Sequence, residues 1–322
     1  MKEERVVLEL PPAEQLLSPE EVQKKLRVPE GFSPDSRVIV YLGQPRCGST
    51  AIACAWGNFD WLRGKVHFQP WKFLQRYGKE LGIDSLELFG DGQNIVVALK
   101  ETPGGPNHYE EIFDPVEILL NAGVPAEIMR VVVVAREPVS QFESWLKFDT
   151  RRRVDVYLAG QEFVLNRLAY YRHLGINAVP LVFEMFYSAE TRLTKSLFEV
   201  WGFDLREYPI PDELSFNKAS IMNDVCWHEA RSDSHYFETV VAPVIERGKF
   251  ELTEPRIFTS SNLPYWIAEF VSQEDQSRLL KEGRRRYLSF ARETVNFWKA
   301  QGFSNRWFDR YLKELEVSLD KD

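Results

Sequence analysis

Runs of consecutive apolar, mostly β-branched residues limit the folds open to this sequence. Three runs are strong, at 37–43 (RVIVYLG), 94–100 (NIVVALK) and 130–136 (RVVVVAR), and a weaker one lies at 179–186 (VPLVFEMF). An unbroken apolar run is typical of a strand buried on both faces, because an exposed face would require polar residues at alternate positions. The runs therefore predict a buried, mostly parallel sheet.

The segments between these runs have helix signals. Asp114 and Pro115 form a helix start, and Gly123 follows the expected end of that helix. A second helical segment ends at Gly175 in the same way. Because strands that alternate with helices form α/β folds, we expect a three-layer sandwich with a mostly parallel central sheet and helices on both faces.

The chain is expected to contain one large domain. Residues 1–35 are rich in Pro, Glu and Lys, which predicts an N-terminal extension with one short helix, and the α/β domain is expected over 36–322. Within it, 216–322 is expected to be mainly helical, to pack on the sheet and to lie on the acceptor side. The basic run at 283–287 (GRRRY) is interpreted as a solvated helix face, with contact to a bound nucleotide as the alternative.

Composition and charge restrict the partners. The 322-residue chain has a formal net charge of −8 and a pI of about 5.4, which disfavours a nucleic-acid-coating surface but permits a local basic pocket. The sequence has three cysteines, no Cys/His cluster with zinc spacing, no apolar signal core and no bilayer-length apolar run. We therefore expect a cytoplasmic protein with no nucleic-acid or membrane partner.

The stretch 38–56 (VIVYLGQPRCGSTAIACAW) joins the first strand to a helix. Its Gly43 and Gly48 have the spacing of the G-x-x-x-x-G-K-[S/T] phosphate loop, but Ser49 occupies the lysine position. The N–H groups at a helix start, the small residues and the cation Arg46 all suit an anion. The sequence therefore predicts an anion-binding loop.

The other strand ends argue against a magnesium-dependent nucleotide hydrolase. Lys100 and Arg136 stand where a magnesium-binding carboxylate is expected in that class. Positive charge there suits a phosphate-rich ligand without an obligatory metal. Cys47 lies inside the loop and is interpreted as packing, with a thiol acidified by the helix N-terminus as the alternative.

Two motifs resemble those of the sulfotransferase superfamily. The segment 44–50 (QPRCGST) resembles the family's 5′-phosphosulfate-binding loop. The segment 131–145 (VVVVAREPVSQFESW) supplies Arg136, Pro138 and Ser144 at the offsets of the family's second signature. The two motifs occur in the family's order and on the expected kinds of element.

A third segment is similar to a family strand that has a Glu near its end and is followed by a helix. Glu184 occupies the Glu position, and we interpret it as a structural hydrogen-bond anchor rather than a catalyst. In all, the resemblance covers about residues 36 to 205.

The resemblance implies a P-loop-like fold and a function. It implies a sulfotransferase that moves the sulfuryl group from 3′-phosphoadenylyl sulfate (PAPS) to an acceptor hydroxyl or amine and releases adenosine 3′,5′-bisphosphate (PAP). Arg46 is expected to stabilise the bridging oxygen, and Arg136 and Ser144 to bind the 3′-phosphate. The 5′-phosphate is expected to be bound by Cys47, Gly48, Ser49 and Thr50. The acceptor is expected to be a small molecule or a carbohydrate.

Three side chains are candidates for the proton acceptor. His67 is ranked first, Glu101 second and His108 third, because branches of the family use either a His or a Glu. Lys100 is expected to be a second cation near the sulfuryl group. Two other functions stay open: a small-molecule or nucleotide kinase with a degenerate loop, and a catalytically inactive nucleotide-binding or scaffold protein.

Overall fold

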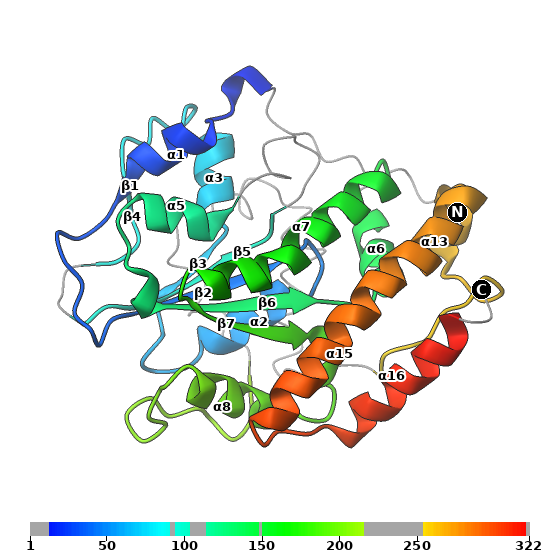
Figure 1. Cartoon of the computed structure of the whole chain (residues 1–322). Coiled ribbons are helices and arrows are strands. Elements are labelled where there is room, and N and C mark those ends of the chain that lie inside the picture. The colour runs from blue at the N-terminus through cyan, green and yellow to red at the C-terminus, as the bar shows by residue number, and fades with distance from the viewer. Residues whose placement is uncertain (1–12, 91–93, 104–113, 148–149, 216–253, 320–322) are drawn as a thin grey trace.

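The computed structural model describes residues 13–90, 94–103, 114–147, 150–215 and 254–319 (Figure 1). In this part of the chain a five-stranded sheet has the order β3-β5-β2-β6-β7, and all of its neighbouring strands are parallel. The strands are β2 (Arg37–Gly43), β3 (Val66–Phe68), β5 (Val96–Glu101), β6 (Met129–Ala135) and β7 (Asn177–Val182). A separate two-stranded sheet pairs β1 (Leu26–Arg27) with β4 (Leu86–Glu87). The predicted α/β fold with a mostly parallel central sheet is confirmed.

The fourth apolar run is only partly a strand. The run was predicted to be extended over 179–186, but β7 ends at Val182 and a 3-10 helix, η3, occupies Phe183–Phe186. The neighbouring strand gives the physical reason. β6 ends at Ala135, which pairs with Val182, so β7 has no strand to pair with beyond Val182. In η3 the buried Glu184 carboxylate accepts hydrogen bonds from the Glu137 N–H and the Tyr287 hydroxyl, which lie outside the sheet.

Helices cover both faces of the five-stranded sheet. Helix α2 (Ser49–Trp56) leads from β2 towards β3, whereas α7 (Val154–His173) leads from β6 to β7 on the other side of β2. Because such crossovers between parallel strands are right-handed, the two helices lie on opposite faces. In Figure 1, α7 and α15 (Arg284–Ala300) lie in front of the sheet and α2 lies behind it.

In the described part of the chain, three further helices lie between the strands, and a fourth follows β7. They are α3 (Pro70–Tyr77), α5 (Pro115–Asn121), α6 (Pro138–Leu146) and α8 (Glu190–Val200). Asp114 caps α5, as predicted, by accepting hydrogen bonds from the N–H groups of Val116 and Glu117 at 2.9 and 3.2 Å. The Phe198 ring of α8 packs edge-on against Trp56 of α2, with 5.3 Å between ring centres.

The described part of the N-terminal segment packs against the domain. It contains the short 3-10 helix η1 (Ala13–Gln15) and α1 (Pro19–Lys25), where Ser18 and Glu21 form a reciprocal capping box. Leu17 and Val22 are buried in the main core. The single short helix predicted for this segment is therefore present, and it contributes apolar side chains to the core.

The region 216–322 was predicted to be mainly helical and to pack on the sheet, and its described part, 254–319, agrees with this; residues 216–253 lie outside the described residues. Helix α13 (Tyr265–Phe270) is followed by an unbroken helical stretch: α14 (Gln273–Arg278), the π-helical turn η5 (Leu279–Gly283) and α15. The last helix is α16 (Arg306–Leu319). The Trp298 indole N–H of α15 donates to the Pro180 carbonyl of β7 at 2.9 Å, which ties this region to the edge of the sheet. None of the helices described here is both long enough and apolar enough to cross a lipid bilayer.

Candidate functional site

The carboxyl ends of β2 and β6 define the candidate site. These strands are neighbours in the sheet, but the chain leaves them in opposite directions, towards β3 and towards β7. At such a point the connections diverge and leave a crevice, which is where α/β proteins bind ligands. The loop 44–48 follows β2 and Arg136 follows β6, so both predicted motifs lie at this point.

The loop 44–48 is held in a defined shape by the protein itself. Arg46 and Gly48 have positive φ angles of 68° and 88°, a conformation that is unfavourable for arginine. Hydrogen bonds stabilise the turn: the Cys47 N–H donates to the Gln44 carbonyl at 3.2 Å, and the Gln141 side-chain amide donates to the Pro45 carbonyl at 2.8 Å. The loop is therefore preorganised.

Gly48 is required by both its conformation and its surroundings. A Cβ atom at this position would lie 2.0 Å from the Phe183 ring. Gly48 is also the N-cap of α2 and supplies no side-chain oxygen to the helix start. The N–H groups that open α2, at the buried Ser49 and the half-buried Thr50, therefore lie next to the turn in an arrangement that suits an anion.

Arg46, Arg136 and Ser144 meet at this loop. The Arg46 Nε–H donates to Ser144 Oγ at 3.0 Å, and an Nη1–H of Arg136 donates to the Arg46 carbonyl at 2.8 Å. The Arg136 guanidinium also lies 5.2 Å from the centre of the Phe183 ring. The N–H donors of a guanidinium suit it to bind an anion. The two sequence motifs are therefore in direct contact at the carboxyl ends of β2 and β6.

The side chain of Cys47, within the loop 44–48, is fully buried. Burial raises the pKa of its thiol, and the charge of Lys100 offsets this only in part. The alternative of a thiol acidified by the helix N-terminus is therefore wrong. A Cβ atom at Gly43 would lie 2.5 Å from the Cys47 sulfur, so the glycine at 43 makes room for this packing.

Lys100 lies on the α2 side of the sheet. It is opposite Tyr41 in the pairing of β5 with β2, and its ammonium lies 5.7 Å from the centre of the Phe68 ring. The Lys100 side chain is almost fully buried and acts electrostatically on both Cys47 and Cys54. A buried cation therefore lies under the loop and the start of α2.

Glu101 points to the opposite face, because successive residues of a strand alternate. Its Oε1 accepts a hydrogen bond from the N–H of Trp71 at 2.9 Å, so Glu101 caps the start of α3 from the neighbouring strand. Its Oε2 is buried and has no hydrogen-bond partner among the residues that the structure describes. Burial raises the pKa of Glu101 from 4.5 to about 7, against the opposing effects of the Trp71 N–H and of Lys72 and Lys100.

His67 lies away from the loop. It belongs to the edge strand β3, and β5 separates it from β2. His67 pairs with Leu99, so its side chain is on the face opposite to that of Lys100. Its Nε2 lies 3.1 Å from the Leu88 carbonyl, which only accepts, so Nε2 carries a proton. His108 lies outside the described residues.

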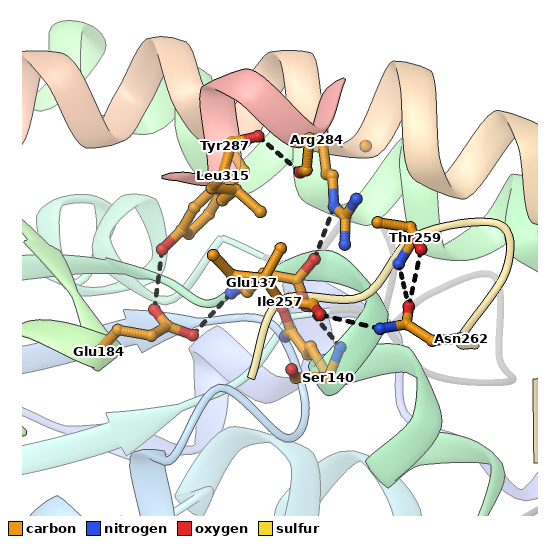
Figure 2. A network of polar contacts seen from close by, with 12 residues as sticks. Glu137, Ser140, Glu184, Ile257, Thr259, Asn262, Arg284, Tyr287 and Leu315 are labelled. Atoms are coloured by element: carbon orange, nitrogen blue, oxygen red, sulfur yellow. Dashed lines mark hydrogen bonds and ion pairs between the residues drawn. The ribbon is translucent and has the colours of Figure 1, made fainter. Parts of the chain in front are cut away.

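A buried polar network next to Arg136 extends the site towards the C-terminal helices (Figure 2). Glu184 Oε1 accepts from the N–H of Glu137 at 2.9 Å, and Glu184 Oε2 accepts from the Tyr287 hydroxyl at 3.0 Å. The Nε–H of Arg284 donates to Glu137 Oε1 at 2.9 Å in an ion pair with no solvent exposure on either side. The predicted anchor role of Glu184 is consistent with these contacts.

The sequence interpretation missed Arg284. The run 283–287 was expected to be a solvated helix face, which is wrong for Arg284, a side chain with no exposed surface. A signal was present: Arg284 lies four residues after Leu280 and three before Tyr287, on the apolar stripe of its helix. A charged residue on such a stripe indicates a buried partner of opposite charge, here Glu137.

A small polar pocket opens beside Arg136, with room for about one water molecule. Three glutamines line it: Gln44, Gln141 and Gln161.

No protein-family model matches the chain, and no curated protein matches it either. The functional assignment therefore depends on the motifs and the geometry of the site.

Proposed function

We propose that the protein is a sulfotransferase that transfers the sulfuryl group of PAPS to an acceptor hydroxyl or amine. The observation that carries this proposal is the meeting of Arg136 and Ser144 with the loop that contains Arg46. A nucleotide with phosphates at both its 5′ and 3′ positions requires two anion-binding groups within one site. We assign the 5′-phosphate to the loop with the start of α2, and the 3′-phosphate to Arg136 and Ser144, both of which contact Arg46.

In the proposed mechanism the protein acts mainly by placement and electrostatics. Loop N–H groups and the hydroxyls of Ser49 and Thr50 bind the 5′-phosphate, and Arg136 with Ser144 binds the 3′-phosphate. Arg46 donates to the bridging oxygen as charge develops on the departing PAP, and Lys100 adds a second positive charge under the loop. The preorganised loop keeps these donors in position during the transfer.

Of the two described candidates for the proton acceptor, we favour Glu101 over His67. Its pKa of about 7 suits a general base at neutral pH, and its Oε2 is available for a new hydrogen bond. The Nε2–H of His67 is already bound to the Leu88 carbonyl, and β5 separates His67 from β2. Because Glu101 is fully buried, an acceptor reaches it only when a neighbouring segment moves. The acceptor class we propose is a small molecule or a carbohydrate.

Ligand binding tests the assignment directly. We expect PAP to bind in EDTA and to raise the melting temperature, because the site uses cationic side chains and N–H groups in place of a metal. Calorimetry should compare PAP with ATP plus magnesium and with NAD. Binding of ATP with magnesium in the absence of PAP binding would instead indicate a kinase.

Substitution of Arg136 tests the site at a single residue. Arg136→Ala should weaken PAP binding by roughly 1.5–3 kcal/mol, the value of hydrogen bonds to a charged group. Arg206→Ala is the control, because Arg206 is exposed and pairs with Asp204 outside the site. Equal PAP affinity in the Arg136 variant and the wild type would contradict the proposed role.

A further inference from the structure

The network of Glu137, Glu184, Arg284 and Tyr287 is not used by the proposed chemistry. None of these side chains exposes more than 2% of its surface, and they come from the start of α6, from η3 and from α15. Replacing a buried ion pair by apolar residues is often neutral or stabilising, so stability alone explains such a network poorly. We therefore ask which atoms of the site the network holds in a fixed position.

The atoms that it fixes surround Arg136. The peptide N–H of Glu137, which directly follows Arg136, donates to Glu184 Oε1. The neighbour of Glu184, Phe183, lies under the Arg136 guanidinium and against Gly48. The 3-10 helix η3 therefore holds both the backbone and the side chain of Arg136.

The C-terminal helices hold η3 in turn. The Tyr287 hydroxyl of α15 donates to Glu184 Oε2 at 3.0 Å. At the start of α16 the Asn305 side-chain amide donates to the Met185 and Tyr187 carbonyls at 3.0 and 3.3 Å. A continuous series of hydrogen bonds and packing contacts thus leads from α15 through Glu184 to Arg136.

We propose that Glu184 and Tyr287 are positioning residues for Arg136, through which α15 sets the preference of the site for a nucleotide with a second, 3′-phosphate. This inference rests on the proposed function, in which Arg136 binds that phosphate. Neither residue touches the ligand. Tyr287 orients the Glu184 carboxylate, Glu184 holds the peptide after Arg136, and Arg136 then meets the phosphate without reorganisation.

The test compares Tyr287→Phe with Tyr311→Phe. The Tyr311 hydroxyl is also buried and lies near the same carboxylates, and within the described part of the chain it has no hydrogen-bond partner, so its loss is a matched control. The affinities for PAP and for AMP, which lacks the 3′-phosphate, should be measured by calorimetry. Tyr287→Phe should lower PAP affinity about 3- to 10-fold, the effect of one hydrogen bond, and leave AMP affinity unchanged. Tyr311→Phe should change neither affinity.

Variants of Glu184 provide a second, independent readout. Glu184→Gln keeps an oxygen that can accept from the Glu137 N–H, so it should retain more of the preference for PAP over AMP than Glu184→Ala. Equal losses of PAP and AMP affinity, or a lower melting temperature with an unchanged preference, would overturn the positioning role. A wild-type protein that binds PAP no more tightly than AMP would instead reject the proposed function itself, and the inference with it.

Discussion

Gly48 occupies the most constrained backbone position of the candidate site. Its φ angle is positive, and the space for a Cβ atom is filled by the Phe183 ring. Gly48→Ala should therefore lower the free energy of unfolding by at least about 2 kcal/mol, since backbone strain and overpacking add. It should also weaken PAP binding. Chemical denaturation and calorimetry measure the two effects.

The control for this substitution is Gly64→Ala. Gly64 also has a positive φ angle, 74°, but a Cβ atom there would meet nothing within 4 Å. This variant isolates the backbone strain from the steric clash. Equal destabilisation by the two substitutions would show that contact with Phe183 does not constrain Gly48.

Glu101 should make stability depend on pH. Its pKa is about 7 in the folded protein, so the folded state holds a proton that the unfolded state releases near pH 4.5. The free energy of unfolding therefore falls as pH rises through this interval, by up to about 3 kcal/mol. Glu101→Gln should remove that loss. The free energy of unfolding of the variant, relative to that of the wild type, should therefore increase when the pH is raised from about 5 to about 8. Denaturation at both pH values measures the difference, and Glu314→Gln, which changes an exposed carboxylate, is the control.

Glu101 should also control the rate of the proposed sulfuryl transfer. With PAPS and an accepted substrate, Glu101→Gln should reduce kcat by about 10²–10⁴-fold, the usual contribution of a general base. His67→Ala should retain most of the activity, because His67 lies on the edge strand. A pH–rate profile that keeps its rise near neutral pH in Glu101→Gln but loses it in His67→Ala would reverse the assignment.

At the scale of single elements, α5 depends on one buried cap. Asp114 accepts from two N–H groups of α5 and from the Tyr171 hydroxyl, and it pairs with Arg167 at 3.2 Å. Asp114→Ala should destabilise the protein by about 3 kcal/mol, because a cap and a buried hydrogen-bonded charge are lost together. Ser272→Ala removes an exposed cap of α14 and should cost about 1 kcal/mol. Thermal denaturation of both variants measures the two losses of stability. Equal losses would contradict the expectation that Asp114→Ala is the more destabilising.

The long elements could be predicted from sequence because their patterns are unambiguous. The run 37–43 coincides with β2, and the runs 94–100 and 130–136 lie within two residues of β5 and β6. The run at 179–186 misled the prediction, since apolar residues continue into η3 and periodicity does not distinguish a buried strand from a buried turn of helix. The two residues each of β1 and β4 are too few to form a pattern.

At the scale of the whole molecule, the site joins residues that are far apart in sequence. The meeting of Arg46 with Arg136 could be anticipated, because both follow adjacent parallel strands of an α/β sheet. The pairing of Arg284 with Glu137 could not, since nothing near either residue in the sequence specifies the other. Burial on a helix stripe indicates that a partner exists, but only the tertiary packing identifies it.

The charge of the whole molecule differs from the charge at the candidate site. The chain as a whole is acidic, with a net charge of −8. Three cationic side chains nevertheless lie at the carboxyl ends of β2, β5 and β6: Arg46, Lys100 and Arg136. A local positive field in an acidic protein favours small anions over long polyanions, because the surrounding surface repels the latter. Overall charge therefore predicts which partners are excluded, and local placement indicates which ones are preferred.

The ion pair between Glu137 and Arg284 also sets an order of events during synthesis. The ribosome releases the loop and β6 well before α15, so the growing chain contains Glu137 while its cationic partner is still untranslated. Until α15 docks, water must solvate that carboxylate, and the junction after β6 cannot close around it. A nascent chain that ends before α15 should therefore lack a finished candidate site, however complete its sheet, and completion of that site becomes the last step of folding.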